Sequence, residues 1–179
     1  MVEEPWRRHH RIGNSFGVFR PPAGVADGDA VMSSTYLSLH YHLVFSTKGR
    51  QPFIDAAWRA RLHEYLGGTI GGLGGFSQGV GGVADHVHLL VGLKATKCLA
   101  DVLRELKKAS SVWVHEQIGE KAFAWQEGYA AFTVSATARD AVRKYIANQE
   151  EHHHRKTFRE ELVEMLERAG VEYDPTYLD

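Results

Sequence analysis

The stretch DHVHLLVGL, residues 85–93, predicts a strand with a buried face. Side chains alternate between the two faces of a strand, so the aliphatic residues at 87, 89 and 91 point together into a core. His86 and His88 then share the opposite face, about 6–7 Å apart along the strand. Two imidazoles at this spacing can bind one divalent ion with the help of a third ligand. A hydrogen-bonded or solvated pair is the alternative.

Outward from this strand, the sequence alternates between strand-like and helix-like patterns. Apolar periodicity predicts strands over residues 36–46, 76–83, 86–93 and 125–135, and helices over residues 54–70, 99–118, 136–153 and 158–169. The elements up to residue 135 follow the order β-α-β-β-α-β. This order is typical of an α+β, ferredoxin-like (split β-α-β) fold, an antiparallel sheet with helices on one face. The C-terminal helices are added to this unit.

The chain is expected to form one domain with less regular ends. Residues 1–33 lack periodicity and contain several glycines and prolines, so we expect a flexible arm or an upstream extension. Residues 34–170 are expected to form the domain, and residues 171–179 a tail. No apolar run is long enough to cross a membrane. The single cysteine, Cys98, fits a reducing cytoplasm.

Net charge alone does not decide whether the chain binds nucleic acid. The formal charge is −1, but residues 158–179 hold two arginines against seven acidic residues, which leaves +4 for residues 1–157. A mildly basic body is compatible with DNA binding without requiring it. One hypothesis is that the acidic segment 158–179 folds over a basic cleft and restrains it, as a mimic of DNA.

The helix predicted over residues 136–153 carries an apolar face that ends in polar residues. Tyr145 lies on this face, and Gln149 and His152 continue it at four and seven residues further on. A tyrosine on such a face usually belongs to the core, but buried glutamine and histidine need polar partners. If the helix docks over the His86 and His88 face, Gln149 supplies the missing ligand and Tyr145 lies beside the metal.

Such a site suits the cleavage of a phosphodiester by a phenolate. Tyrosine can form a covalent intermediate once its proton is removed and the phosphate charge is offset. A metal would offset that charge as a Lewis acid. A hard phosphate ligand and the lack of a cysteine cluster favour Mg²⁺ or Mn²⁺ over zinc. A second His-x-His pair, His40 and His42, brings His42 near the metal if its strand is adjacent, and hydrogen-bonded histidines are the alternative there.

Basic and aromatic side chains outside this site are candidates for DNA contacts. The basic candidates follow the first strand or lie on two of the helices: Lys48, Arg50, Arg104, Lys107, Lys108, Arg143 and Lys144. If they contact phosphates, affinity falls with salt; solvated faces are the alternative. Trp125 would stack on an unpaired base or belong to the core.

A His-hydrophobe-His strand together with a Tyr-x-x-x-Gln helix is a specific combination, and it lies within several segments that match a known family. They are YHLVFSTKGRQPF (41–53), ADHVHLLVGL (84–93), LKKASS (106–111), WQEGYAAFTVS (125–135) and VRKYIANQEEHHHRKTFREEL (142–162). With these segments the chain resembles the single-tyrosine HUH transposases of small bacterial insertion sequences, most closely the REP-associated tyrosine transposases. The resemblance covers roughly residues 35–179.

The resemblance implies a mechanism as well as a fold. His86 and His88 would be metal ligands with Gln149 as the third, and Tyr145 would be the nucleophile that takes a 5′-phosphotyrosine linkage and frees a 3′-hydroxyl. The implied substrate is single-stranded DNA with hairpins or palindromic repeats. Relatives in insertion sequences work as dimers, so a homodimer is implied too.

Two other functions fit the same residues. The first is a non-catalytic, domesticated module that binds single-stranded nucleic acid on the same fold. The second is a metal-dependent nuclease in which an activated water takes the place of Tyr145. A Tyr145→Phe variant separates both from the tyrosine mechanism.

Overall fold

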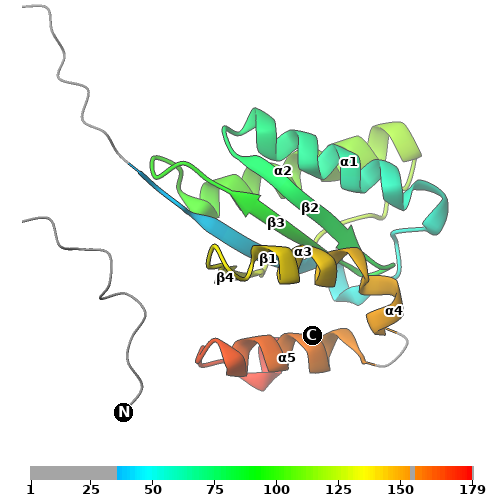
Figure 1. Cartoon of the computed structure of the whole chain (residues 1–179). Helices are drawn as coiled ribbons and strands as arrows, with labels where there is room; N and C mark the ends of the chain where they lie inside the picture. Colours follow the sequence, from blue (N-terminus) through cyan, green and yellow to red (C-terminus); the bar gives the residue numbers. More distant parts are fainter. Residues whose placement is uncertain (1–35, 154–155, 179) are drawn as a thin grey trace, which may run out of the picture. The chain divides into compact units, whose positions relative to one another are not determined.

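The computed structural model describes residues 36–153 and 156–178 (Figure 1). The predicted arm, residues 1–33, lies outside the described residues. The strands are β1 (His40–Ser46), β2 (Phe76–Gly82), β3 (His86–Gly92) and β4 (Ala130–Thr133). The helices are α1 (Ala56–Gly72), α2 (Leu99–Trp113), α3 (Arg139–Ala147), α4 (Gln149–His153) and α5 (Phe158–Arg168). Short turns of other helix types cover Lys48–Arg50, Val114–Ile118 and Pro175–Tyr177.

The described residues form one four-stranded antiparallel sheet in the order β2-β3-β1-β4. The two central strands, β1 and β3, pair along their whole length, with Val44 opposite His88 and Ser46 opposite His86. This arrangement confirms the predicted α+β, split β-α-β fold.

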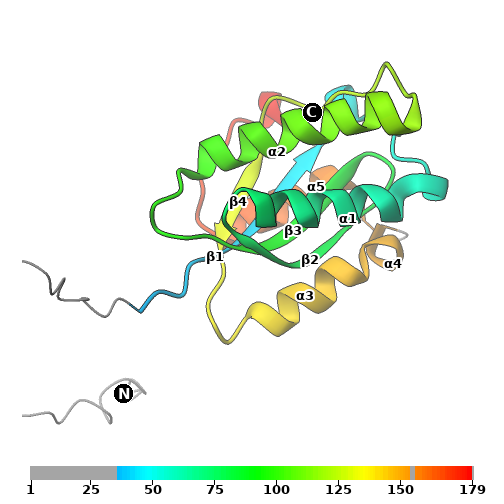
Figure 2. The same ribbon diagram turned by 90° about the horizontal axis from the view of Figure 1, so that it is seen from above.

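The main core lies between the sheet and the helices α1 and α2, which cover one face (Figure 2). Val87, Leu89 and Val91 of β3 are fully buried there, as the alternation in the sequence predicted. Burial of such aliphatic and aromatic side chains is the dominant stabilising contribution to a domain of this size. The opposite face of β3 is therefore the face that presents His86 and His88.

Helix α3 packs on that opposite face, against β2 and β3. A second, smaller apolar cluster forms there, with Leu90, Val134 and Ile146 buried. The glycines of β2 allow the close approach: a Cβ added to Gly81 would lie 2.0 Å from the carbonyl oxygen of Ile146. The glycine-rich sequence of β2 thus sets how near the Tyr145 helix comes to the sheet.

Two predicted elements differ from the observed ones. The helix over residues 136–153 is broken at Asn148, whose backbone leaves helical values, so α3 and α4 are separate. The strand over residues 125–135 is mostly wrong, because only Ala130–Thr133 pairs with β1 while Trp125 forms a single bridge to Thr47. The carbonyls of residues 126–128 accept hydrogen bonds from Lys107 Nζ, and one backbone hydrogen bond, from Gln126 to the carbonyl of Ser46, joins this segment to β1.

Helices of the described residues are too short or too polar to cross a membrane.

Replacing Gly81 by alanine is expected to lower the free energy of unfolding by roughly 1–3 kcal/mol, because the new methyl group meets backbone that cannot rotate away. Gly68→Ala is the matched control, since a Cβ at Gly68 meets nothing within 4 Å and alanine favours the helix. Urea unfolding of both variants measures the difference. Equal stabilities would contradict the proposed contact between β2 and α3.

The stability of the fold is expected to depend on pH through His63 of α1. Burial, with a smaller contribution from the nearby Arg59, lowers the pKa of His63 from 6.5 to about 4. The unfolded chain therefore binds the proton more readily than the folded chain, and stability falls as pH drops from about 6.5 to about 4. Between pH 7 and pH 5 we expect His63→Gln to lose about 1–2 kcal/mol less than the wild type, as measured by urea unfolding. An identical loss in both proteins would refute this role of His63.

Candidate active site

The two histidines of β3 are completely buried beneath the C-terminal helices. His86 and His88 are each 0% exposed, which rules out the solvated alternative in this structure. Each ring has one nitrogen tied to a neighbour: His86 Nδ1 lies 2.7 Å from Asp85 Oδ1, and His88 Nδ1 lies 2.9 Å from His42 Nε2. The Nε2 atoms of the pair face the same small volume. His42, the member of the second pair that was expected near this site, thus holds His88 in place.

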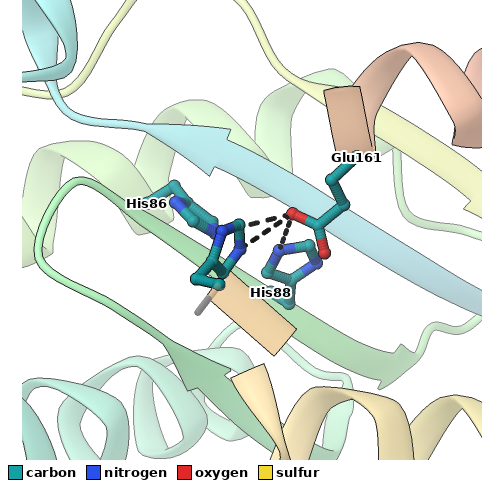
Figure 3. A group of neighbouring side chains, drawn as sticks. His86, His88 and Glu161 are labelled. Carbon is teal, nitrogen blue, oxygen red and sulfur yellow. Dashed lines mark ion pairs between the residues drawn. The ribbon is translucent and has the colours of Figure 1, made fainter. Parts of the chain in front are cut away.

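A carboxylate from α5 lies among these rings. Glu161 is 2% exposed, and its Oε2 is 3.4 Å from His88 Nε2 and 3.7 Å from His86 Nε2 (Figure 3). The start of α5 is fixed by a capping box between Thr157 and Glu160. Since Phe158 packs on His86 with ring centroids 4.4 Å apart, the first turn of α5 sits directly over the histidine pair.

Helix α4 contributes two more polar side chains. His153 Nε2 lies 3.1 Å from Glu161 Oε2, and His153 Nδ1 donates to the carbonyl oxygen of Lys156 at 2.9 Å. Gln149 is 2% exposed; its amide nitrogen donates to Glu161 Oε1 and its amide oxygen lies near His153 Nε2, both at 3.0 Å. Gln149 therefore lies at the predicted site, where it contacts Glu161 and His153.

Tyr145 reaches the same carboxylate from α3. Its hydroxyl donates to Glu161 Oε1, and its ring lies 5.9 Å from the ring of His88 and 6.1 Å from that of His42. The predicted neighbour His152 packs against Tyr145, with ring centroids 5.1 Å apart. In the structure, Tyr145 and Gln149 lie over the histidine pair of β3, which is the arrangement that the sequence analysis made a condition for the site.

Burial and one negative charge set the protonation of the site. Burial raises the pKa of Tyr145 far above its usual value, and the Glu161 carboxylate raises it further. Burial opposes the ionisation of Glu161, but the imidazoles of His153 and His88 beside it hold its pKa well below the usual range. Burial lowers the pKa of His88 to about 4 and that of His42 to about 3. In this arrangement Tyr145 is a neutral hydrogen-bond donor to an ionised Glu161.

The donor atoms at the centre of the site fit a divalent cation. His86 Nε2, His88 Nε2 and Glu161 Oε2 are buried without a hydrogen-bond partner. Buried polar atoms without partners are costly, and these three converge on one point. Two imidazoles and a carboxylate are a donor set that divalent metals bind.

Two of the predicted DNA-contacting residues have structural contacts within the protein. Trp125 is buried, packs on Phe45 with ring centroids 4.8 Å apart, and donates from Nε1 to Ser110 Oγ at 2.9 Å, so its ring offers no face to a base. Lys107 donates to the backbone carbonyls of residues 126–128 at 2.6–3.2 Å. Both residues stabilise the loop before β4, and a contact of either residue with DNA stays a prediction.

The other predicted contacts lie at or near the surface, in different surroundings. Arg104 pairs with Asp101, and Arg143 pairs with Asp140, in each case through neighbours on its own helix. Arg50 lies closest to the site, 3.6 Å from Asp85 and with its guanidinium 5.2 Å from the centroid of the Phe158 ring. The remaining three are exposed: Lys48, Lys108 and Lys144.

Glu161 and His153 were not singled out by the sequence reasoning. The signal for Glu161 was present, because it lies on the face of α5 whose apolar members, Phe158 and Leu166, are buried. An acid on an apolar helix face needs a partner when the face docks. His153 lies in a run of three histidines, 152–154, of which His154 lies outside the described residues.

Comparison with known proteins identifies the class of this fold and site. Residues 35–149 match the family described as "Transposase IS200 like". Since this match spans more than half of the chain, the chain belongs to the IS200-like transposase family. The resemblance found in the sequence is thereby confirmed, and the chain is a transposase with DNA as its partner.

Individual relatives agree with this assignment. The chain is 29% identical over 119 residues to the ISDra2 transposase TnpA of Deinococcus radiodurans, covering 62% of this chain and 84% of the relative. It resembles the crystal structure of a candidate transposase from Deinococcus radiodurans R1 with a TM-score of 0.54 and 25% identity, over 65% of this chain and 95% of that one. A REP-associated tyrosine transposase bound to a REP hairpin shares the fold with a TM-score of 0.50 and 14% identity, over 68% and 74% of the two chains.

The structural role of Lys107 gives a prediction with a matched control. Lys107→Ala is expected to lower the free energy of unfolding by about 1–3 kcal/mol, because three carbonyl groups lose their donor. Lys108→Ala removes the same charge from an exposed neighbour and should leave stability unchanged. Urea unfolding at neutral pH compares the two variants. Equal effects would show that the contacts of Lys107 add nothing to the fold.

Proposed function

We propose that this transposase cleaves and rejoins single-stranded DNA through a covalent bond to Tyr145. One observation carries the proposal: the Tyr145 hydroxyl and the His86 and His88 imidazoles meet at the same buried carboxylate, that of Glu161. A nucleophile and a metal-binding histidine pair at one point are what phosphodiester cleavage by tyrosine requires.

In the proposed reaction the Tyr145 oxygen attacks the phosphorus of the scissile phosphate. A phosphorus–oxygen bond to tyrosine forms, the bond from phosphorus to the 3′-oxygen breaks, and the proton lost by Tyr145 balances the proton gained by the 3′-oxygen. The products are a 5′-phosphotyrosine and a free 3′-hydroxyl. Attack of a 3′-hydroxyl on the same phosphorus reverses the step and rejoins a strand.

A divalent ion, Mg²⁺ or Mn²⁺, would offset the charge of the phosphate as a Lewis acid when it is bound. His86 and His88 would hold it, and the family resemblance implies Gln149 as a third donor. The protein's own contribution is to orient Tyr145, since α3 is held against β2 and β3 by a buried apolar cluster.

We propose hairpin-containing single-stranded DNA as the substrate. The REP-associated tyrosine transposase that shares this fold is bound to a REP hairpin. In the present chain a cavity of about 450 Å³ opens beside the site. Its polar lining consists of Arg50, His153, Lys156 and Thr157 together with two acidic residues, Asp85 and Glu160. Cationic and hydroxyl side chains there suit a phosphate group. The homodimer implied by the family resemblance stays a prediction.

Replacing Tyr145 by phenylalanine is expected to abolish cleavage and the covalent protein–DNA adduct while binding is kept. The assay incubates the full chain with a hairpin-flanked single strand and Mn²⁺, and detects the adduct by denaturing electrophoresis. Tyr129→Phe is the control, because Tyr129 is 43% exposed and lies outside the site.

Two outcomes would favour other functions. Nicking that persists in Tyr145→Phe would make an activated water the nucleophile. Metal-independent binding by the wild type without any cleavage would support a non-catalytic module that binds single strands.

A further inference from the structure

We infer that His153 and Glu161 are ligands of the metal ion and complete a four-donor centre with His86 and His88. The inference rests on the proposed function, because it takes the histidine pair of β3 as metal-binding. It adds donors from the chain beyond α3, and so makes the first turn of α5 a part of the metal site.

The positions of the four donor atoms carry the inference. His86, His88, His153 and Glu161 each offer one ligand atom, and these four atoms all lie within 4.8 Å of one another. Glu161 Oε2 is 3.7, 3.4 and 3.1 Å from the three imidazole nitrogens in that order. The edge of a tetrahedron with metal–ligand bonds of about 2.0–2.1 Å is roughly 3.3–3.4 Å. The spacing thus fits donors that surround one ion.

The second atom of each ligand group is already engaged. The Nδ1 atom of His86 contacts Asp85, and the Nδ1 atom of His88 contacts His42. The Nδ1 atom of His153 donates to the carbonyl oxygen of Lys156. In Glu161 the other oxygen accepts from Tyr145 and Gln149. Outer contacts of this kind orient metal ligands in proteins. Three of the donor atoms, His86 Nε2, His88 Nε2 and Glu161 Oε2, have no hydrogen-bond partner, whereas His153 Nε2 contacts Gln149 Oε1 at 3.0 Å.

The burial of Glu161 also calls for a cation. Its carboxylate is 2% exposed, and an ionised carboxylate is costly to bury unless a positive charge or a metal is beside it. Among the described residues, no lysine or arginine forms an ion pair with Glu161; the basic groups around it are imidazoles. A divalent ion among those imidazoles would balance the carboxylate.

Gln149 takes a different role under this inference. Its amide contacts Glu161 with one end and His153 with the other, both at 3.0 Å. It would therefore position Glu161 through its amide nitrogen, in place of the ligand role that the family resemblance implies. The contact of its amide oxygen with His153 Nε2 would be replaced by the ion. His153 and Glu161 both lie beyond residue 149, where the match to the family ends, so that resemblance does not account for them.

The donor set bears on the choice of metal. Three imidazoles and one carboxylate suit transition ions such as Mn²⁺, whereas Mg²⁺ favours oxygen ligands and keeps several waters. We therefore expect the full chain to bind Mn²⁺ more tightly than Mg²⁺ in the absence of DNA.

The test measures metal binding directly, without DNA or turnover. Mn²⁺ is titrated into the full chain and followed by electron paramagnetic resonance, for the wild type, Glu161→Gln and His153→Ala. Each substitution should weaken Mn²⁺ binding by about tenfold or more. Glu167→Gln is the control, since it makes the same change on the same helix away from the site, and it should bind as the wild type does.

A second measurement keeps the inference testable if a variant folds poorly. Nitrogen couplings to bound Mn²⁺ should correspond to three imidazoles in the wild type and to two in His153→Ala, in samples whose circular dichroism matches.

Unchanged or tighter Mn²⁺ binding by Glu161→Gln would overturn the inference, and would make Glu161 a competitor of the metal. Couplings from only two imidazoles in the wild type would overturn it as well. Failure of the proposed function gives a different pattern, in which Mn²⁺ binds as expected but no Tyr145 adduct forms.

Discussion

The carboxylate of Glu161, buried among imidazoles, is the constraint on which this face of the sheet depends. It contacts His86 and His88 from β3, His153 from α4 and Tyr145 from α3. A buried charge tolerates only geometries that keep its partners in place. The relative placement of these helices and the strand therefore depends on a single side chain. A change in the charge of Glu161 would alter its contacts with all of these elements.

Sequence periodicity was sufficient for the parts of the site that lie on regular elements. Alternation in β3 separated the aliphatic face from His86 and His88, and helical spacing placed Tyr145 and Gln149 on one side. It could not supply Glu161, because that residue meets β3 only through the docking of α5, more than seventy positions along the chain. Contacts of this kind leave no local pattern apart from an acid on an otherwise apolar helix face.

The sequence did not decide the structural roles of Trp125, Lys107 and Asn148, and the physical reason is the same for all three. A sequence does not show whether an aromatic ring or a lysine faces solvent or a neighbouring loop. Here both Trp125 and Lys107 stabilise the loop before β4. Helical periodicity likewise continues through Asn148, although the backbone does not. The chain turns at Asn148, which separates α4 from α3 and brings His153 toward Glu161. The position of His153 in the site therefore depends on a break in the helix that periodicity did not predict.

The contact between Gly81 and the carbonyl oxygen of Ile146 has an evolutionary consequence. At this contact the backbone of β2 meets the backbone of α3 directly, because Gly81 has no side chain. The contact therefore sets the distance of α3 from the sheet. Substitutions in the core under α1 and α2 can accumulate and repack while the nucleophile-bearing helix keeps its distance from the histidine pair. Sequences with this fold are thus free to drift in their hydrophobic interior as long as one position in β2 carries no side chain.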